Sequence, residues 1–83
     1  MWSYDAEVRW TTQKQGELSA QRNPVVTVAT PPEFGGVPDV WCPEQLLIGA
    51  VVSCLMTTAL HFFERMAVTV ESYSATGREN KRR

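Results

Sequence analysis

The sequence is poor in the residues that build disulfide-stapled, metal-binding or nucleic-acid-binding domains. It has two cysteines and one histidine, too few for the disulfide framework of a small secreted protein or for a tetrahedral metal site. The net charge is −1, and the basic residues are scattered until the segment 78–83. A nucleic-acid binder carries a basic face within its folded part. We therefore expect no metal, no cofactor and no nucleic-acid partner.

The sequence also lacks an export signal, because no basic segment precedes an apolar one at its N-terminus. This absence predicts a cytoplasmic location. A chain of 83 residues forms one domain at most, and so short a chain buries only about 60–65% of its unfolded surface. Domains of this size often gain stability from a partner subunit.

The longest uncharged run extends from Leu46 to Phe63. Its length of about 18 residues is the threshold for a membrane span. Ser53, Cys54 and His61 interrupt it and strand-like segments flank it, which favours a helix enclosed by protein over one in a membrane. A chain this short has few residues with which to bury a helix on every side, so we expect a homodimer.

The residues around this run predict the bounds of the helix. Pro43 suits the first helical position, where its missing N–H has no cost, and Glu44 favours the positive end of the helix dipole. We predict one long buried helix from Pro43 to about Met66.

Alternating and β-branched segments predict strands on both sides of that helix. The expected strands are residues 2–10 (half-buried), 18–22, 25–29 and 68–73. Residues 11–16 are expected to form a turn, and the prolines and glycines of residues 31–39 a loop. The predicted class is α+β, with N-terminal antiparallel strands, one long buried central helix and a further strand.

Three motifs occur in order: Pro-Pro-Glu-Phe-Gly-Gly at 31–36, Pro-Glu-Gln-Leu-Leu at 43–47, and Ser-Cys at 53–54. With the strand-rich frame around them, they resemble the OsmC/Ohr family of organic hydroperoxide reductases. The resemblance extends from Tyr4 to Gly77 and is greater to the general OsmC-like branch than to the strict organic-hydroperoxide-resistance branch.

The resemblance implies an OsmC-like intertwined dimer, with long helices enclosed by sheets from both chains and active sites at the subunit interface. The family's peroxidatic cysteine falls on Cys54 and its helix-start carboxylate on Glu44. The family's arginine that holds the thiolate is replaced by Lys14. The resolving cysteine belongs to a C-terminal half that these residues do not include, so residues 1–83 resemble a single, incomplete N-terminal portion of the domain.

A peroxidatic cysteine reacts as a thiolate and becomes a sulfenic acid. Cys54 is predicted in mid-helix, too far from the N-terminus for the dipole to help, so activation requires a cation. Lys14, Arg9 and Arg22 are the candidates, although lysine lacks the forked donors of arginine. The alternative is that Cys54 is an inert small apolar side chain, as buried cysteines commonly are.

Helical spacing limits which residues can assist Cys54. Cys42 lies about 18 Å away along one helix, whereas a disulfide needs Cα atoms within about 7 Å. Only a contact between subunits could bring the two cysteines together, so Cys42 is more simply the residue at the helix cap. His61 lies about 10.5 Å away, which excludes a direct dyad within one helix. Glu44 lies about 15 Å away and either cooperates through a basic side chain, a bend or the other subunit, or only stabilises the helix start.

The sequence therefore predicts thiol-dependent reduction of organic hydroperoxides, with an external dithiol as reductant. Within one chain, a sulfenic acid at Cys54 is expected to persist or over-oxidise. The alternative function is a non-catalytic dimeric OsmC-like module that binds a small apolar ligand between helices. A resolving cysteine in the full-length protein favours the enzyme, and its absence favours the binding module.

Overall fold

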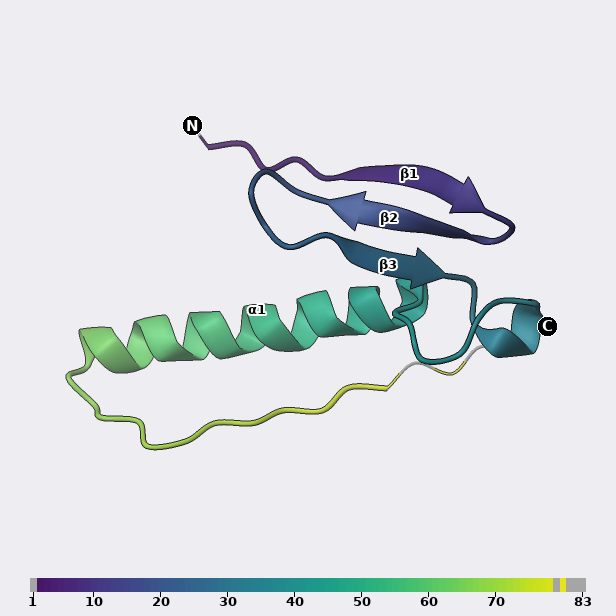
Figure 1. Cartoon of the computed structure of the whole chain (residues 1–83). Helices are drawn as coiled ribbons and strands as arrows, with labels where there is room; N and C mark the ends of the chain where they lie inside the picture. Colours follow the sequence, from purple (N-terminus) through teal and green to yellow (C-terminus); the bar gives the residue numbers. More distant parts are fainter. Residues whose placement is uncertain (1, 79, 81–83) are drawn as a thin grey trace. The chain divides into compact units, whose positions relative to one another are not determined.

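The computed structural model describes residues 2–78 and 80. They divide into two compact units, Met1–Pro43 and Glu44–Arg83, and each unit is described by itself (Figure 1).

The N-terminal unit contains a three-stranded antiparallel sheet in the order β1-β2-β3. The strands are β1 (Glu7–Thr12), β2 (Gln15–Ser19) and β3 (Val26–Ala29). With the helix of the second unit, this sheet confirms the predicted mixture of α and β structure.

The β1–β2 hairpin is tighter than predicted. Thr12 pairs with Gln15, so the turn is limited to Gln13 and Lys14. Gln13 has a positive φ of 47°, and the indole Nε1 of Trp10 donates a hydrogen bond of 2.6 Å to its carbonyl oxygen. Because the turn closes early, β2 lies three residues before the predicted segment 18–22.

Strand β1 begins at Glu7 rather than Trp2, because Glu7 pairs with Ser19 at the end of β2. After Ser19 the chain leaves β1 and forms a turn, in which Asn23 N–H donates to Ala20 O at 3.0 Å. The residues before Glu7 therefore have no strand opposite them. The predicted half-burial is also wrong for this chain, since every residue of β1 is exposed.

The predicted loop contains a short 3₁₀ helix, η1 (Pro32–Phe34). Gly35 ends it with a left-handed φ of 88°, and Gly36 N–H donates to Pro31 O at 3.0 Å. The chain then returns beside β3, where Ala29 N–H donates to Trp41 O at 2.9 Å. This return buries Ala29, which is 3% exposed.

The C-terminal unit contains helix α1 (Pro43–Arg65) from Glu44 onward and the segment that follows it. The bounds confirm the predicted helix to within one residue. Val68 N–H donates to Phe63 O at 2.9 Å and Ala67 N–H to Glu64 O at 3.1 Å, the pattern of a Schellman motif. Ala67 occupies its left-handed position with φ 57°.

The predicted strand 68–73 is wrong: the residues described after α1 contain no strand. The chain instead returns along the helix (Figure 1), and Gly77 lies against Ile48 and Val52. The alternation at Val68 and Val70 needs a strand beside it to form a ladder, and this unit supplies only a helix.

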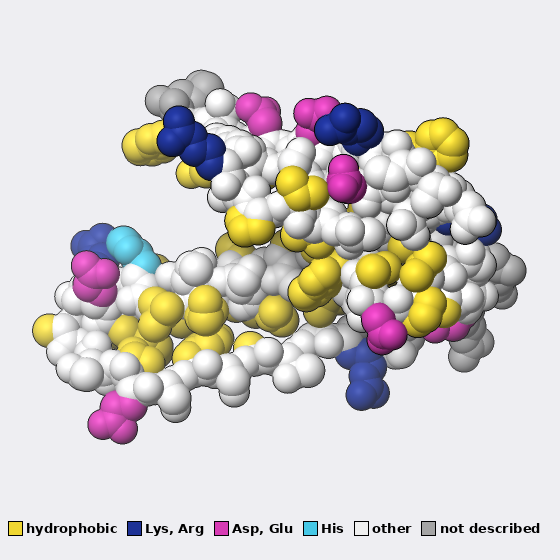
Figure 2. All heavy atoms as spheres, in the orientation of Figure 1, with side chains coloured by type: hydrophobic (Ala, Val, Ile, Leu, Met, Phe, Trp, Pro, Cys, Tyr) yellow, Lys and Arg dark blue, Asp and Glu magenta, His cyan; other side chains and the backbone are white. Residues whose placement is uncertain are grey.

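No residue of α1 is buried within the chain. Apolar side chains line the helix face visible in Figure 2, and Leu47 and Leu55 are 59% and 58% exposed. By length and composition α1 could cross a membrane, a property shared with core helices of soluble proteins. The expected burial on every side is thus not provided by the chain itself.

Two glycines give a matched test of this fold. An added Cβ at Gly36 would overlap the Thr30 carbonyl, whereas at Gly49 it would meet nothing within 4 Å. Gly36→Ala should destabilise the N-terminal unit by roughly 3 kcal/mol or more, and Gly49→Ala should stabilise α1 by about 1 kcal/mol. All three tryptophans, Trp2, Trp10 and Trp41, lie in the N-terminal unit. In urea titrations, tryptophan fluorescence reports unfolding of the N-terminal unit and helical circular dichroism reports unfolding of α1, so the two effects can be measured separately. Equal stability of wild type and Gly36→Ala would contradict the loop geometry.

Candidate functional site

Cys54 lies at the midpoint of α1 and is exposed. Its neighbours one turn away on the helix are Ala50, Val51, Thr57 and Thr58. Thr57 Oγ1 donates to the carbonyl oxygen of Cys54 at 3.1 Å, so this hydroxyl is directed to the backbone of its own helix. The thiol therefore stands on a small, mostly apolar patch that is open to a reagent or to another chain.

Cys42 has the opposite environment. It is 9% exposed, and it directly follows Trp41, whose backbone pairs with β3. Both cysteines are thiols rather than halves of a disulfide. Because α1 is continuous from Pro43 through Cys54, an intrachain bond between the cysteines would require the helix to unwind. The position of Cys42 directly before the helix agrees with the cap position expected from the sequence.

Lys14 belongs to the N-terminal unit, where it joins the hairpin to η1. Its Nζ donates to Phe34 O at 3.0 Å, and its own carbonyl accepts Thr30 N–H at 3.1 Å. A Cβ on Gly35 would lie 3.0 Å from Lys14 Nζ. Lys14 thus positions the Pro-Glu-Phe-Gly loop.

Glu44 lies in the first turn of α1 and is half-buried. The ten residues between it and Cys54 correspond to about 15 Å along the helix, and at about 100° per residue the two side chains are about 80° apart around it. They share one side of α1 but do not meet within a chain. The other candidate cations, Arg9 on β1 and Arg22 in the turn after β2, are exposed residues of the N-terminal unit.

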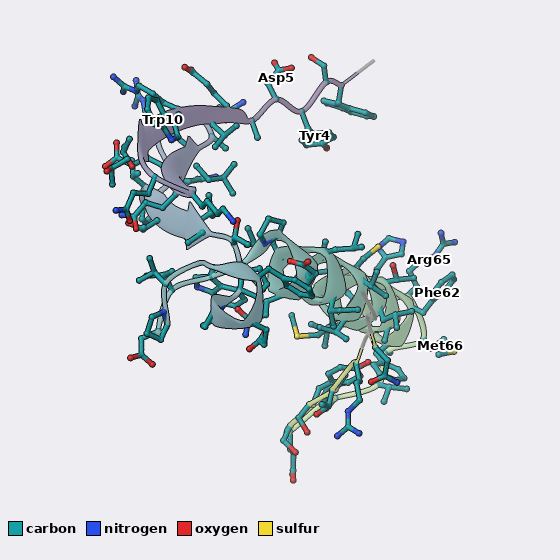
Figure 3. All side chains as sticks on the ribbon, turned by 90° about the vertical axis from the view of Figure 1, so that its right-hand side faces the viewer. Tyr4, Asp5, Trp10, Phe62, Arg65 and Met66 are labelled. Atoms are coloured by element: carbon teal, nitrogen blue, oxygen red, sulfur yellow. The ribbon has the colours of Figure 1, made fainter. Side chains whose placement is uncertain are left out.

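His61 contacts Phe62 rather than a thiol. The two rings meet edge to face, with centroids 5.8 Å apart and an interplanar angle of 69°. Figure 3 shows Phe62, Arg65 and Met66 projecting from the C-terminal end of α1. Within residues 2–78 and 80, no three His, Cys, Asp or Glu side chains are grouped to hold a metal ion.

The hydrogen bond between Lys14 and Phe34 was not found by sequence reasoning. It joins residues twenty positions apart, and no local pattern signals such a contact. The Gly35-Gly36 pair predicted a loop, but it did not predict that a lysine side chain would lie against that loop.

No protein-family model matches this chain, and no curated protein matches its sequence significantly. The resemblance to the OsmC/Ohr family therefore depends on the motifs at residues 31–36, 43–47 and 53–54 and on the strand-rich frame around them.

Proposed function

We propose that the chain is part of an OsmC-like cytoplasmic homodimer that reduces organic hydroperoxides with the thiol of Cys54. The observation that carries the proposal is the contrast between the two cysteines: Cys54 is exposed in the middle of an apolar helix, whereas Cys42 is buried. The helix start at Pro43-Glu44 and the turn at 31–36, which support the resemblance in the sequence, are both formed.

The reaction balances as a two-electron transfer. The Cys54 thiolate attacks the terminal oxygen of the hydroperoxide, the O–O bond breaks, and the alcohol leaves after taking up a proton. The sulfur becomes a sulfenic acid. An external dithiol then reduces the sulfenic acid, and the products are water, a disulfide in the reductant and the Cys54 thiol.

The surroundings of Cys54 favour an alkyl hydroperoxide over hydrogen peroxide. Leu47, Val51 and Leu55 are all more than half exposed and lie within two turns of the thiol. An alkyl chain placed against these side chains removes their apolar surface from water, at about 25 cal/mol per Å². Hydrogen peroxide gains nothing from that surface.

Glu44 and Lys14 have supporting roles in the proposal. Glu44 acts as a polarising carboxylate at the helix start, and Lys14 supplies a cation that holds the thiolate. Lys14 and Cys54 belong to different units, so mutation, rather than a distance, is the test of this pairing.

The second candidate is a non-catalytic dimeric module that binds a small apolar ligand between helices. The exposed apolar side chains of α1 favour it equally. The two functions differ in one outcome, since a binding module leaves added hydroperoxide unconsumed.

Cys54, rather than Cys42, should be the first thiol oxidised by cumene hydroperoxide. Cys42 must wait for local opening of the N-terminal unit, so we expect it to react at least roughly tenfold more slowly. Brief exposure in the presence of a sulfenic-acid trap, followed by mass spectrometry, measures both sites. Cys42→Ser should retain the labelled product and Cys54→Ser should lose it. Labelling of Cys42 alone, or of neither thiol, would contradict the proposal.

Substitutions at Lys14 separate its structural role from a role at the thiolate. Lys14→Arg should accelerate oxidation of Cys54, because arginine supplies a forked set of donors. Lys14→Met should slow it by about fivefold, the effect of losing one exposed charge pair worth about 1 kcal/mol. Single-turnover peroxide consumption gives the rates, and tryptophan fluorescence reports whether the loop stays folded. Identical rates in all three proteins would limit Lys14 to holding the Phe34 carbonyl.

A further inference from the structure

We propose that Lys14 is an acylation site and that its charged side chain is a latch on the loop of residues 30–41. Acylation of Lys14 releases this loop and makes the thiol of Cys42 accessible. This role goes beyond the proposed function, which uses Cys54 and gives Cys42 no part. The residues concerned all belong to the N-terminal unit.

The loop is held beside the sheet at its start, its middle and its end. At the start, Thr30 N–H donates to the carbonyl oxygen of Lys14 at 3.1 Å, and at the end the Trp41 carbonyl accepts from Ala29 N–H at 2.9 Å. In the middle, Lys14 Nζ donates to Phe34 O at 3.0 Å. The hydrogen bonds at the ends join backbone atoms, whereas the one in the middle depends on a single side chain. A change at that side chain therefore releases the middle of the loop.

The Lys14 side chain is open to a reagent. Lys14 lies in the tight turn between β1 and β2, and it is exposed. This turn and η1 lie at the same end of the sheet (Figure 1). The other lysine of the sequence, Lys81, falls outside the described residues. Lys14 is therefore the one lysine in the part of the chain that the structure describes.

Acylation removes the charge on which the latch depends. The uncharged amine of Lys14 attacks the acyl carbon of an acyl phosphate, the bond from that carbon to the phosphate oxygen breaks, and phosphate departs with the proton lost by nitrogen. The product is a neutral amide with one N–H in place of three ammonium donors. A neutral donor makes a weaker hydrogen bond to Phe34 O than a charged one. Space is also short, since a Cβ on Gly35 would lie 3.0 Å from Nζ, so an added acyl group must displace the side chain or the loop.

The end of the loop leads directly to Cys42, which is 9% exposed. The preceding residue, Trp41, pairs with Val28 and accepts from Ala29 N–H. A reagent reaches Cys42 when this end of the loop opens locally. A loop held at its middle has fewer open conformations than a loop held only at its ends. Release at Phe34 therefore raises the fraction of molecules in which Cys42 is accessible.

Alkylation of Cys42 by iodoacetamide tests the latch. In Cys54→Ser protein, Cys42 is the remaining thiol. Adding Lys14→Gln should raise its alkylation rate about tenfold, the factor expected for loss of one exposed hydrogen bond from a charged donor. Lys14→Arg should leave the rate near that of the parent, because arginine keeps the charge and the donors. Arg22→Gln removes an exposed charge elsewhere in the same unit and should also leave it unchanged. Equal rates in all these proteins would overturn the latch.

Acetylation of protein that is already folded tests the modification, whether or not a variant folds. Cys54→Ser protein is treated with limiting acetyl phosphate and briefly alkylated, and intact chains are fragmented in a mass spectrometer, so that both groups are assigned on the same molecule. We expect acetyl groups on Lys14 and a higher share of alkylated Cys42 among the molecules that carry them. Tryptophan fluorescence should show that the N-terminal unit stays folded. Absence of acetylation at Lys14, equal alkylation with and without it, or unfolding of the whole unit would overturn the proposal.

Discussion

Helix α1 presents apolar side chains around most of its circumference, and no residue of it is buried within its own chain. The returning segment contacts it at Ile48 and Val52 but leaves Leu47, Val51 and Phe62 more than half exposed. Covering one such side chain contributes about 1 kcal/mol or more, so water is an unfavourable surrounding for this helix. We propose that a second copy of the chain covers part of this helix in a homodimer.

The N-terminal unit has little apolar core: among the described residues, its buried apolar side chains are Ala29 and Cys42. Backbone hydrogen bonds and one lysine hold it together. The Trp41 carbonyl accepts from β3, and Lys14 fastens the turn that contains Phe34. These contacts bury Cys42 directly before the helix and leave Cys54 as the accessible thiol. The burial of Cys42 therefore supports the proposal that Cys54 is the thiol that reacts.

Local signals in the sequence predicted the parts of the fold that depend on local chemistry. Pro43 and Glu44 located the helix start, and the β-branched residues around Val26 located β3. Contacts with distant residues decided the rest. The start of β1 depends on where β2 ends, and the segment around Val68 lacks a neighbouring strand. The motif at residues 53–54 predicted that Cys54 is the reactive residue, and this stays a prediction. The contact of Lys14 with Phe34 arises only in three dimensions.

We propose that α1 is stable only when a second copy covers it. Sedimentation velocity and far-ultraviolet circular dichroism, measured on the same samples from micromolar to nanomolar concentration, test this dependence on a second copy. We expect a dimer at micromolar concentration and a joint loss of dimer and helix on dilution. A folded monomer that keeps its full helical signal throughout would contradict it.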